Sequence, residues 1–261
     1  MRINFLYVGI LIITLTSCNG YEKILKSTDI KLKYKKAFEY YNKEDYTRSS
    51  ALLEDISTAY QGSTKADSVY FFLAKSNYNL GFYEAAGVYY DMVFQKLPYS
   101  QFAHESEYMS AYCLYLVSPK PSLDQSNTTK AIEQFQAYLR KYPSGNYAAK
   151  SNELITELRD KLVDKSFYGA KLYYDLGMYK SSIVALRNSL DEFPNTKHRE
   201  KLMWYVLSSR FLLAENSIES KKKERFQETV DEYYSFISEF PKSEYKDDAE
   251  SIYRNSEKMI K

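Results

Sequence analysis

The chain has 261 residues, 44% of them hydrophobic and 27% charged, which are ordinary values for a globular protein and exclude wholesale disorder. A formal net charge of +2, from 36 basic and 34 acidic residues, gives no electrostatic argument for nucleic-acid binding. The 8 Gly and 6 Pro are too few for a typical all-β sandwich, and the 2 His have no partner at ligand spacing, which argues against a metal site or histidine-based catalysis.

The first predicted element is a signal peptide. Arg2 supplies a positive start, and the apolar run 5–13 is too short to span a membrane but long enough for the core of a signal peptide. Residues 15–18, Leu-Thr-Ser-Cys, resemble the bacterial lipobox, in which small residues precede the cysteine that receives a lipid. A plain signal peptide or a membrane anchor with a chance cysteine is the alternative.

The lipobox resemblance implies a modified N-terminus. It places a diacylglycerol thioether on Cys18, with cleavage before this residue and acylation of the new N-terminus, for example by palmitate. We therefore expect residues 1–17 to be the signal peptide and residues 18–29 a lipidated linker. Residues 19–23 lack the acidic cluster that some lipoproteins use for surface export, which favours the periplasmic face. Cys113, in an apolar helical segment, is then left without a cysteine partner and is expected to be a buried small hydrophobe.

Five repeats of one apolar pattern follow the linker. After its opening residue, each repeat has a small residue three positions later and large residues seven and fourteen positions later, which keeps one face of a helix apolar. A proline then ends the helix in four repeats, whereas the first has Gln61. The openings are Tyr46, Tyr83, Thr128, Tyr179 and Phe226, the small residues are Ser49, Ala86, Ala131, Ser182 and Thr229, and the prolines are Pro98, Pro143, Pro194 and Pro241.

A second apolar pattern precedes each of these helices and predicts a partner helix. It opens with an aromatic residue and has a small residue three positions later, which lets the two helices approach closely. Because one helix pair cannot bury its apolar face alone, we expect the pairs to stack side by side. The openings are Tyr34, Phe71, Tyr108, Phe167 and Tyr205, and the small residues are Ala37, Ala74, Ala111, Ala170 and Ser208.

The connections differ among the repeats. Short turns at 43–45, 80–82 and 176–178 join the two helices of repeats one, two and four, whereas longer connections are expected around 118–121 and 217–223. An extra apolar segment at 147–162 predicts an additional helix between repeats three and four. The closing segment has apolar residues on one face and charged residues elsewhere, which predicts a C-terminal capping helix.

The helix pairs resemble tetratricopeptide repeats. Residues 80–83 and 176–179 look like the inter-helix turn of that family, and the prolines match its terminal proline. Five such repeats behind a lipobox resemble the BamD family of outer membrane protein assembly lipoproteins, most strongly over 142–196, although Gln61 stands where the family usually has proline. The resemblance implies an all-α fold over residues 30–261: a right-handed α-solenoid of five tetratricopeptide-like hairpins plus a C-terminal capping helix.

The family resemblance also implies a function and a location. It predicts a scaffold component of the outer-membrane β-barrel protein assembly machinery, lipid-anchored at the periplasmic face of the outer membrane. In that family the N-terminal repeats receive unfolded barrel substrates through a C-terminal signal, and the C-terminal repeats dock on the periplasmic domains of the central β-barrel subunit. We expect the same two partners for this chain, with no enzyme activity, no cofactor and no nucleic acid.

By the same resemblance, the first helices line a groove for a partner. Their 4-then-3 spacing places each trio of side chains on one helical stripe. Aromatic residues with an occasional Lys suit an extended peptide that ends in an aromatic residue and a carboxylate. The alternative is that such a stripe only packs in the core. The predicted partner-binding residues are Tyr34, Phe38, Tyr41, Phe71, Lys75, Tyr78, Tyr108 and Tyr115.

Other functions have weaker support in the sequence. The basic run 220–225 is either a nucleic-acid patch or a solvated loop before a helix, and the acidic residues that follow favour the loop. No set of nucleophile, base and orienting residue is apparent, so an enzyme is disfavoured. A glycan-transport partner lipoprotein usually has a much longer chain and more than the 1 Trp found here. An envelope or cell-division adaptor usually adds a coiled coil, and no sustained heptad run occurs.

Overall fold

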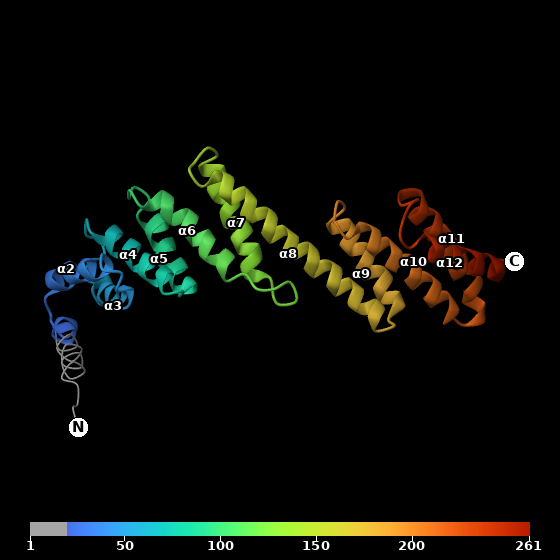
Figure 1. The fold of residues 1–261 in the computed structure, drawn as a ribbon, viewed down its shortest axis with the longest axis horizontal. Helices are drawn as coiled ribbons and strands as arrows, with labels where there is room; N and C mark the ends of the chain where they lie inside the picture. Colours follow the sequence, from blue (N-terminus) through green and yellow to red (C-terminus); the bar gives the residue numbers. More distant parts are fainter. Residues whose placement is uncertain (1–19) are drawn as a thin grey trace, which may run out of the picture. The chain divides into compact units, whose positions relative to one another are not determined.

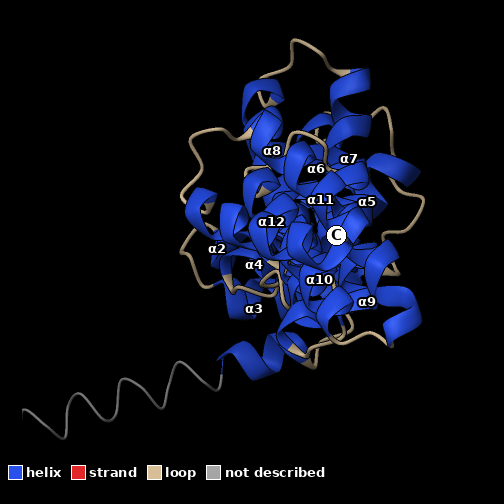
Figure 2. Cartoon of the chain, turned by 90° about the vertical axis from the view of Figure 1, so that its right-hand side faces the viewer, coloured by secondary structure: helices blue, strands red, loops and turns tan. Residues whose placement is uncertain are grey.

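The computed structural model describes residues 20–261, so the predicted signal peptide and the predicted lipid site at Cys18 lie outside the described residues. Within the described range the regular elements are helices joined by turns, without strands, as Figure 2 shows. The predicted all-α fold class is therefore confirmed. No helix of residues 20–261 combines the length and the apolar character needed to cross a bilayer.

The described helices follow one another as pairs with a closing helix (Figure 1). Neighbouring helices pack against each other from α2 to α7 and from α9 to α12, the stacking expected of tetratricopeptide-like hairpins. The pairs are α2 (Ile30–Tyr41) with α3 (Tyr46–Ser57), α4 (Ala66–Asn79) with α5 (Tyr83–Lys96), α6 (Ala103–Leu116) with α7 (Ser126–Lys141), α8 (Ala148–Asp175) with α9 (Tyr179–Glu192), and α10 (Arg199–Glu215) with α11 (Glu219–Glu239), followed by α12 (Lys246–Ile260).

The chain divides into two compact units. The first unit runs to Pro119 and includes Gln125–Leu158, and the second comprises Lys120–Asp124 and Arg159–Lys261. Each unit has its own buried apolar clusters, which lie between α2, α3, α4, α5 and α6 in the first and between α8, α9, α10, α11 and α12 in the second. Helix α8 begins in the first unit and ends in the second.

The extra helix predicted at 147–162 is not a separate element. It is the first part of α8, which continues without a break to Asp175 over 28 residues. Leu154, Ile155 and Leu158 are buried as their spacing predicted, but residues 159–168 contain neither Gly nor Pro. Because nothing in that stretch interrupts the helical hydrogen bonds, the extra segment and the first helix of repeat four form one element.

The small residues of both predicted patterns lie in the helix contacts. The five in the second helices are fully buried, and those in the first helices are at most 6% exposed. Two of the serines form matching hydrogen bonds between neighbouring repeats: Ser76 with Ser49 at 3.3 Å, and Ser182 with Ser209 at 3.0 Å. Close approach of the helices therefore leaves these buried hydroxyl groups satisfied.

The short turns between paired helices share one backbone conformation. The middle residue has positive φ in each: +60° at Glu44, +80° at Gly81 and +71° at Gly177. Glycine adopts this left-handed conformation without a steric penalty, whereas Glu44 has a Cβ atom that opposes it. The sequence pattern of the turns therefore reflects a shared αL position that ends the first helix.

The helices end and begin close to the predicted positions, with one exception. Helices α5, α7, α9 and α11 stop two residues before Pro98, Pro143, Pro194 and Pro241. The exception is the basic run 220–225, which was expected to be a loop and instead lies within α11, which begins at Glu219. Ion pairs along this turn, Lys222 with Glu219 at 3.1 Å and Lys221 with Glu224 at 3.2 Å, favour the helix because residues three apart face each other.

Candidate partner-binding surface

Six of the predicted partner-binding residues lie half-buried on the first helices of the first unit. We call these six, together with Phe72 and Tyr112, the first-helix surface. Tyr34, Phe38 and Tyr41 lie on one stripe of α2 because residues four and three apart lie on the same helical face. The members are Tyr34, Phe38 and Tyr41 of α2, Phe72, Lys75 and Tyr78 of α4, and Tyr112 and Tyr115 of α6.

The residues of this surface connect one first helix to the next. The rings of Phe38 and Tyr41 on α2 each lie 4.8 Å, between centroids, from that of Phe72 on α4. Tyr78 on α4 lies 6.4 Å from Tyr112 on α6. These edge and tilted contacts leave each ring partly accessible, so the same side chains hold neighbouring repeats together and present aromatic surface.

Two of the predicted residues lie in the core instead. Phe71 is 3% exposed and stacks on Phe102 with 4.3 Å between ring centroids. Tyr108 is 7% exposed and stacks on Tyr147 at 4.2 Å, and its burial raises the pKa of the phenol to about 12. Their first-helix positions are as predicted, but a partner has little access to them, so we do not include them in the first-helix surface.

Phe72 and Tyr112 were not selected from the sequence, although signals for both were present. Tyr112 stands four residues after Tyr108 and three before Tyr115, which is the spacing used for the other two trios. Phe72 follows Phe71, and only the rotation of α4 decides which of the two adjacent rings turns into the core. The structure buries Phe71 and leaves Phe72 half-buried between α2 and α4.

Lys75 supplies the positive charge of the first-helix surface. Its ammonium group lies 3.4 Å from a carboxylate oxygen of Glu105 on α6 and 5.2 Å from the centre of the Phe71 ring. Both partners of the ion pair are about one-third exposed, which makes the pair weak and exchangeable in water. A carboxylate from outside can therefore compete with Glu105 for Lys75.

The far end of this surface is a hydrogen-bonded tyrosine. The Tyr115 hydroxyl on α6 donates to a carboxylate oxygen of Glu157 on α8 at 2.6 Å. This hydrogen bond raises the pKa of Tyr115 to about 12, so the hydroxyl stays protonated at neutral pH. The first helices of the unit are thus joined from α2 through α8 by aromatic and polar contacts.

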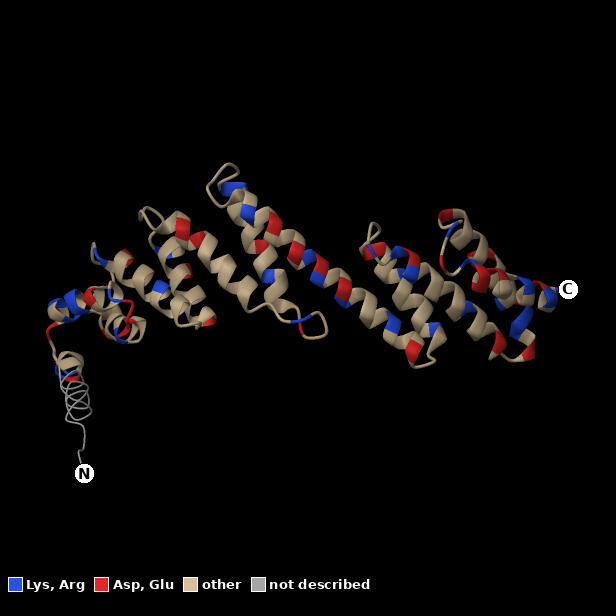
Figure 3. Cartoon of the chain, viewed as in Figure 1, with Lys and Arg blue, Asp and Glu red and all other residues tan. Residues whose placement is uncertain are grey.

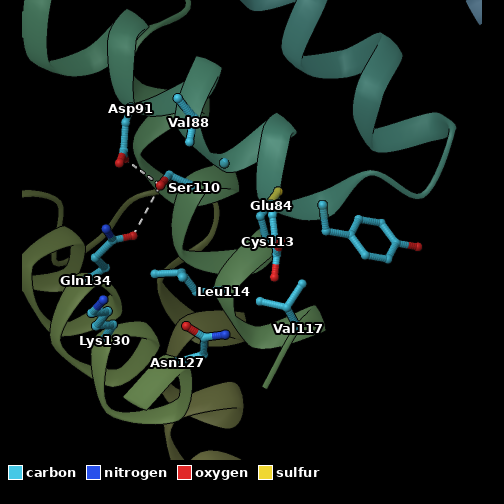
Figure 4. A pocket seen from close by; sticks show the side chains of 12 residues that line it. Glu84, Val88, Asp91, Ser110, Cys113, Leu114, Val117, Asn127, Lys130 and Gln134 are labelled. Carbon is cyan, nitrogen blue, oxygen red and sulfur yellow. Dashed lines mark hydrogen bonds between the residues drawn. The ribbon is translucent and has the colours of Figure 1, made fainter. Parts of the chain in front are cut away.

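A pocket of about 290 Å³ opens between α5, α6 and α7 in the same unit, as shown in Figure 4. Gly87 and Val88 of α5 form part of its wall, and Glu84 and Lys130 bring charges of opposite sign. The Ser110 hydroxyl lies within hydrogen-bond distance of Asp91 (2.5 Å) and Gln134 (3.2 Å). Burial raises the pKa of Asp91, an effect that the Ser110 hydrogen bond opposes.

Cys113 lies against this pocket but is 1% exposed. Burial, with a smaller contribution from Asp91, raises the pKa of its thiol to about 12, so the thiol is neutral and unreactive at neutral pH.

The burial of Cys113 can be tested by chemical labelling. We expect maleimide to label Cys113 in a Cys18→Ser chain at least about tenfold more slowly in buffer than in denaturant, because the thiol is enclosed in the folded protein. Equal labelling rates, measured by mass spectrometry, would contradict the burial.

The second unit carries a different set of surface features. The carboxylate of Glu232, 8% exposed, accepts from Arg187 at 2.6 Å and Arg210 at 2.8 Å, and Arg210 also pairs with Glu228. The end of α8, the turn 176–178 and the first half of α9 expose four aliphatic side chains: Leu172, Leu176, Met178 and Val184. The repeat-four trio Phe167, Lys171 and Tyr174 has the spacing of Phe71, Lys75 and Tyr78.

The histidines and acidic residues of the range 20–261 do not come together as a metal site. No group of three or more His, Cys, Asp and Glu side chains in this range is arranged to hold a metal ion. His104 contacts the Tyr138 hydroxyl at 2.8 Å within a cluster of tyrosine rings, and His198 contacts Asp164 at 2.7 Å while stacking on Phe167. Both histidines thus have structural partners.

The amino-acid sequence is similar to a known protein family and to a protein of another organism. Residues 27–224 match the model of the YfiO family, described as an outer membrane lipoprotein family. A protein of Aquifex aeolicus (strain VF5), named as an outer membrane protein assembly factor, BamD, is 26% identical over 243 residues. The aligned region covers 92% of this chain and 78% of that protein.

Proposed function

Because the chain belongs to the YfiO family of outer membrane lipoproteins, we propose that it is a scaffold component of the machinery that assembles β-barrel proteins in the outer membrane. The observation that carries the proposal is the family match over residues 27–224, which includes the whole first-helix surface. The relative named as an assembly factor supports the same process. A scaffold needs surfaces that hold other proteins, and stacked helix pairs provide such surfaces.

The two partners predicted from the sequence belong to this proposal. We assign unfolded barrel substrates to the first-helix surface of the first unit, and the central barrel subunit to the second unit. Half-buried aromatic rings and the exchangeable Lys75–Glu105 pair support the first assignment, because a peptide ending in an aromatic residue and a carboxylate needs both kinds of contact. The exposed aliphatic side chains of α8, α9 and the turn between them support the second assignment.

The overall proposal is tested by recovering the partners. The chain is cross-linked in cells and purified from detergent-solubilised outer membranes, and co-purified proteins are identified by mass spectrometry. We expect a large barrel protein with periplasmic domains. Recovery of only a sugar transporter, or only of cell-wall enzymes, would instead favour one of the two alternative functions considered from the sequence.

The substrate assignment is tested by a thermodynamic cycle on Lys75. A peptide ending in phenylalanine is prepared with a free carboxylate and with a C-terminal amide, and the affinity of each is measured for the native chain and for Lys75→Gln. We expect amidation to weaken binding to the native chain about tenfold, the value of a charge-assisted hydrogen bond near 1.5 kcal/mol, and to have almost no effect on Lys75→Gln.

Lys171 offers a matched control for this cycle. It also pairs with an acidic residue, Asp175 at 2.6 Å, and also lies over an aromatic ring, that of Tyr205 at 5.3 Å, but it belongs to repeat four. Lys171→Gln should therefore keep the full effect of amidation. An equal loss in both variants would show that the carboxylate responds to general charge, and the assignment of substrates to the first-helix surface would fail.

A further inference from the structure

The segment that enters the first repeat is strongly basic. Between residues 20 and 36, six lysines occur with only two acidic residues, a local net charge of +4 in a chain whose formal net charge is +2. Figure 3 shows the Lys and Arg residues gathered on α2 and on the segment before it. The described end of the chain that lies nearest to Cys18 in sequence therefore carries a local excess of positive charge.

Most of this charge is presented to solvent. Lys23, Lys31 and Lys35 are exposed, and Lys26, with its side chain 80% exposed, reaches Glu22 only at 3.6 Å. Lys33 differs because it is buried and paired with Asp55. One of the two acidic groups is already engaged: the Asp29 carboxylate accepts the backbone N–H groups of residues 31 and 32 at the start of α2.

Apolar side chains lie among these lysines. Leu25 is 37% exposed, Ile30 41% and Leu32 36%, although large aliphatic residues normally turn inward at the start of a helical domain. A basic segment that also exposes aliphatic side chains has the composition that binds at a membrane interface, because the lysines reach the headgroups while the aliphatic groups enter the boundary region.

The start of this basic segment is fixed to the first repeat. The Tyr21 ring meets the Tyr40 ring edge-on at 5.7 Å, and the Arg48 guanidinium lies over both rings at 5.3 and 5.6 Å. Ile24 packs against the buried apolar cluster between α2, α3 and α4. Cys18 precedes Tyr21 by three residues, a stretch that spans at most about 11 Å when fully extended. A lipid on Cys18 would therefore hold α2 at the bilayer surface.

We propose that Lys23, Lys26, Lys31 and Lys35, with Leu25, Ile30 and Leu32, form a membrane-facing surface that binds the anionic phospholipid headgroups of the bilayer carrying the lipid anchor. We call these seven residues the tether surface. Its position next to the bilayer rests on the proposed lipidation of Cys18, but its affinity for anionic lipid does not. The surface orients the first repeat on the membrane, which the acyl chains alone cannot do because they fix only one point.

The test measures lipid affinity without the anchor and without protein partners. The chain from residue 18 onward with Cys18→Ser, which contains every described helix, is mixed with vesicles of phosphatidylethanolamine and phosphatidylglycerol, or of phosphatidylcholine alone. We expect binding to the phosphatidylglycerol vesicles only, with weaker binding at high salt because exposed charges are then screened. The combined variant Lys23→Gln, Lys26→Gln, Lys31→Gln and Lys35→Gln should bind at least tenfold more weakly.

A matched variant removes the same charge elsewhere. It carries glutamine at the exposed Lys96, Lys201, Lys223 and Lys242 and should retain binding within about twofold of the unsubstituted chain, because only charges close to the bilayer contribute. Absence of binding to phosphatidylglycerol vesicles, or equal losses in the two variants, would overturn the proposal. If the tether variant binds vesicles normally but no longer recovers the barrel protein from membranes, the surface belongs to a protein partner and the proposal also fails.

The outcome is separable from that of the proposed function. The vesicle assay contains neither an acylated cysteine nor an assembly partner, so it can succeed when partner recovery fails. Conversely, the Lys75 cycle uses a soluble peptide and no membrane, and its result does not depend on the tether surface.

Discussion

Phe135→Ala is expected to lower the free energy of unfolding of the first unit by about 3–5 kcal/mol. Phe135 is fully buried in α7, and its ring lies 5.9 Å from that of Tyr108 on α6. Removing the ring leaves a cavity between two paired helices, and neighbouring side chains fill such a cavity only in part. The loss is measured by urea unfolding followed by circular dichroism.

Two controls sharpen this experiment. Phe135→Leu keeps most of the apolar volume and should cost less than about 1.5 kcal/mol. The chain has 1 Trp, and Trp204 lies in the second unit, stacked on Tyr245 at 5.0 Å, so its fluorescence reports on that unit. A destabilisation below about 1 kcal/mol for Phe135→Ala would contradict the packing of α6 on α7 described above.

Cys18→Ala is expected to release the protein from the membrane fraction almost completely. Each buried CH₂ of an acyl chain contributes about 0.8 kcal/mol to membrane binding, so several chains on one residue hold a protein stably, whereas the basic tether surface alone binds reversibly. The distribution between membrane and soluble envelope fractions is measured after a high-salt wash, and the N-terminal peptide is identified by mass spectrometry.

The second cysteine is the control for this experiment. Cys113→Ala removes a buried thiol from the first unit and leaves the lipobox intact, so it should remain in the membrane fraction. Retention of the salt-washed Cys18→Ala protein on membranes, or an unmodified residue 18 in the native protein, would refute lipidation at this position.

Much of the fold could be predicted because its cause is local. The small residues, the aromatic positions and the prolines recur at fixed spacing, and each has a direct physical effect on helix approach, burial or termination. The two errors arose where no local signal marks a boundary. Residues 159–168 contain no helix breaker, so α8 continues through them, and α11 starts earlier than expected because ion pairs stabilise a run that looked like a loop.

The candidate site could be predicted only in outline. Spacing alone assigned Tyr34, Phe38 and Tyr41 to one stripe, and the structure places all three half-buried beside α4. The same spacing could not separate Phe71 from Phe72, because the rotation of α4 between its two neighbours decides which ring is enclosed. Whether the half-buried rings hold a partner remains a prediction, which the Lys75 cycle addresses.

The sequence by itself determined the all-α class, the paired helices, the shared turns and the family, because periodic burial and helix termination depend on residues a few positions apart. Only the tertiary structure decided which aromatic residues are enclosed, that Lys75 pairs with Glu105 on the neighbouring first helix, and that Tyr21 is fixed between Tyr40 and Arg48. These contacts join residues brought together by the stacking of separate helices, and side-chain exposure depends on all the surrounding helices at once.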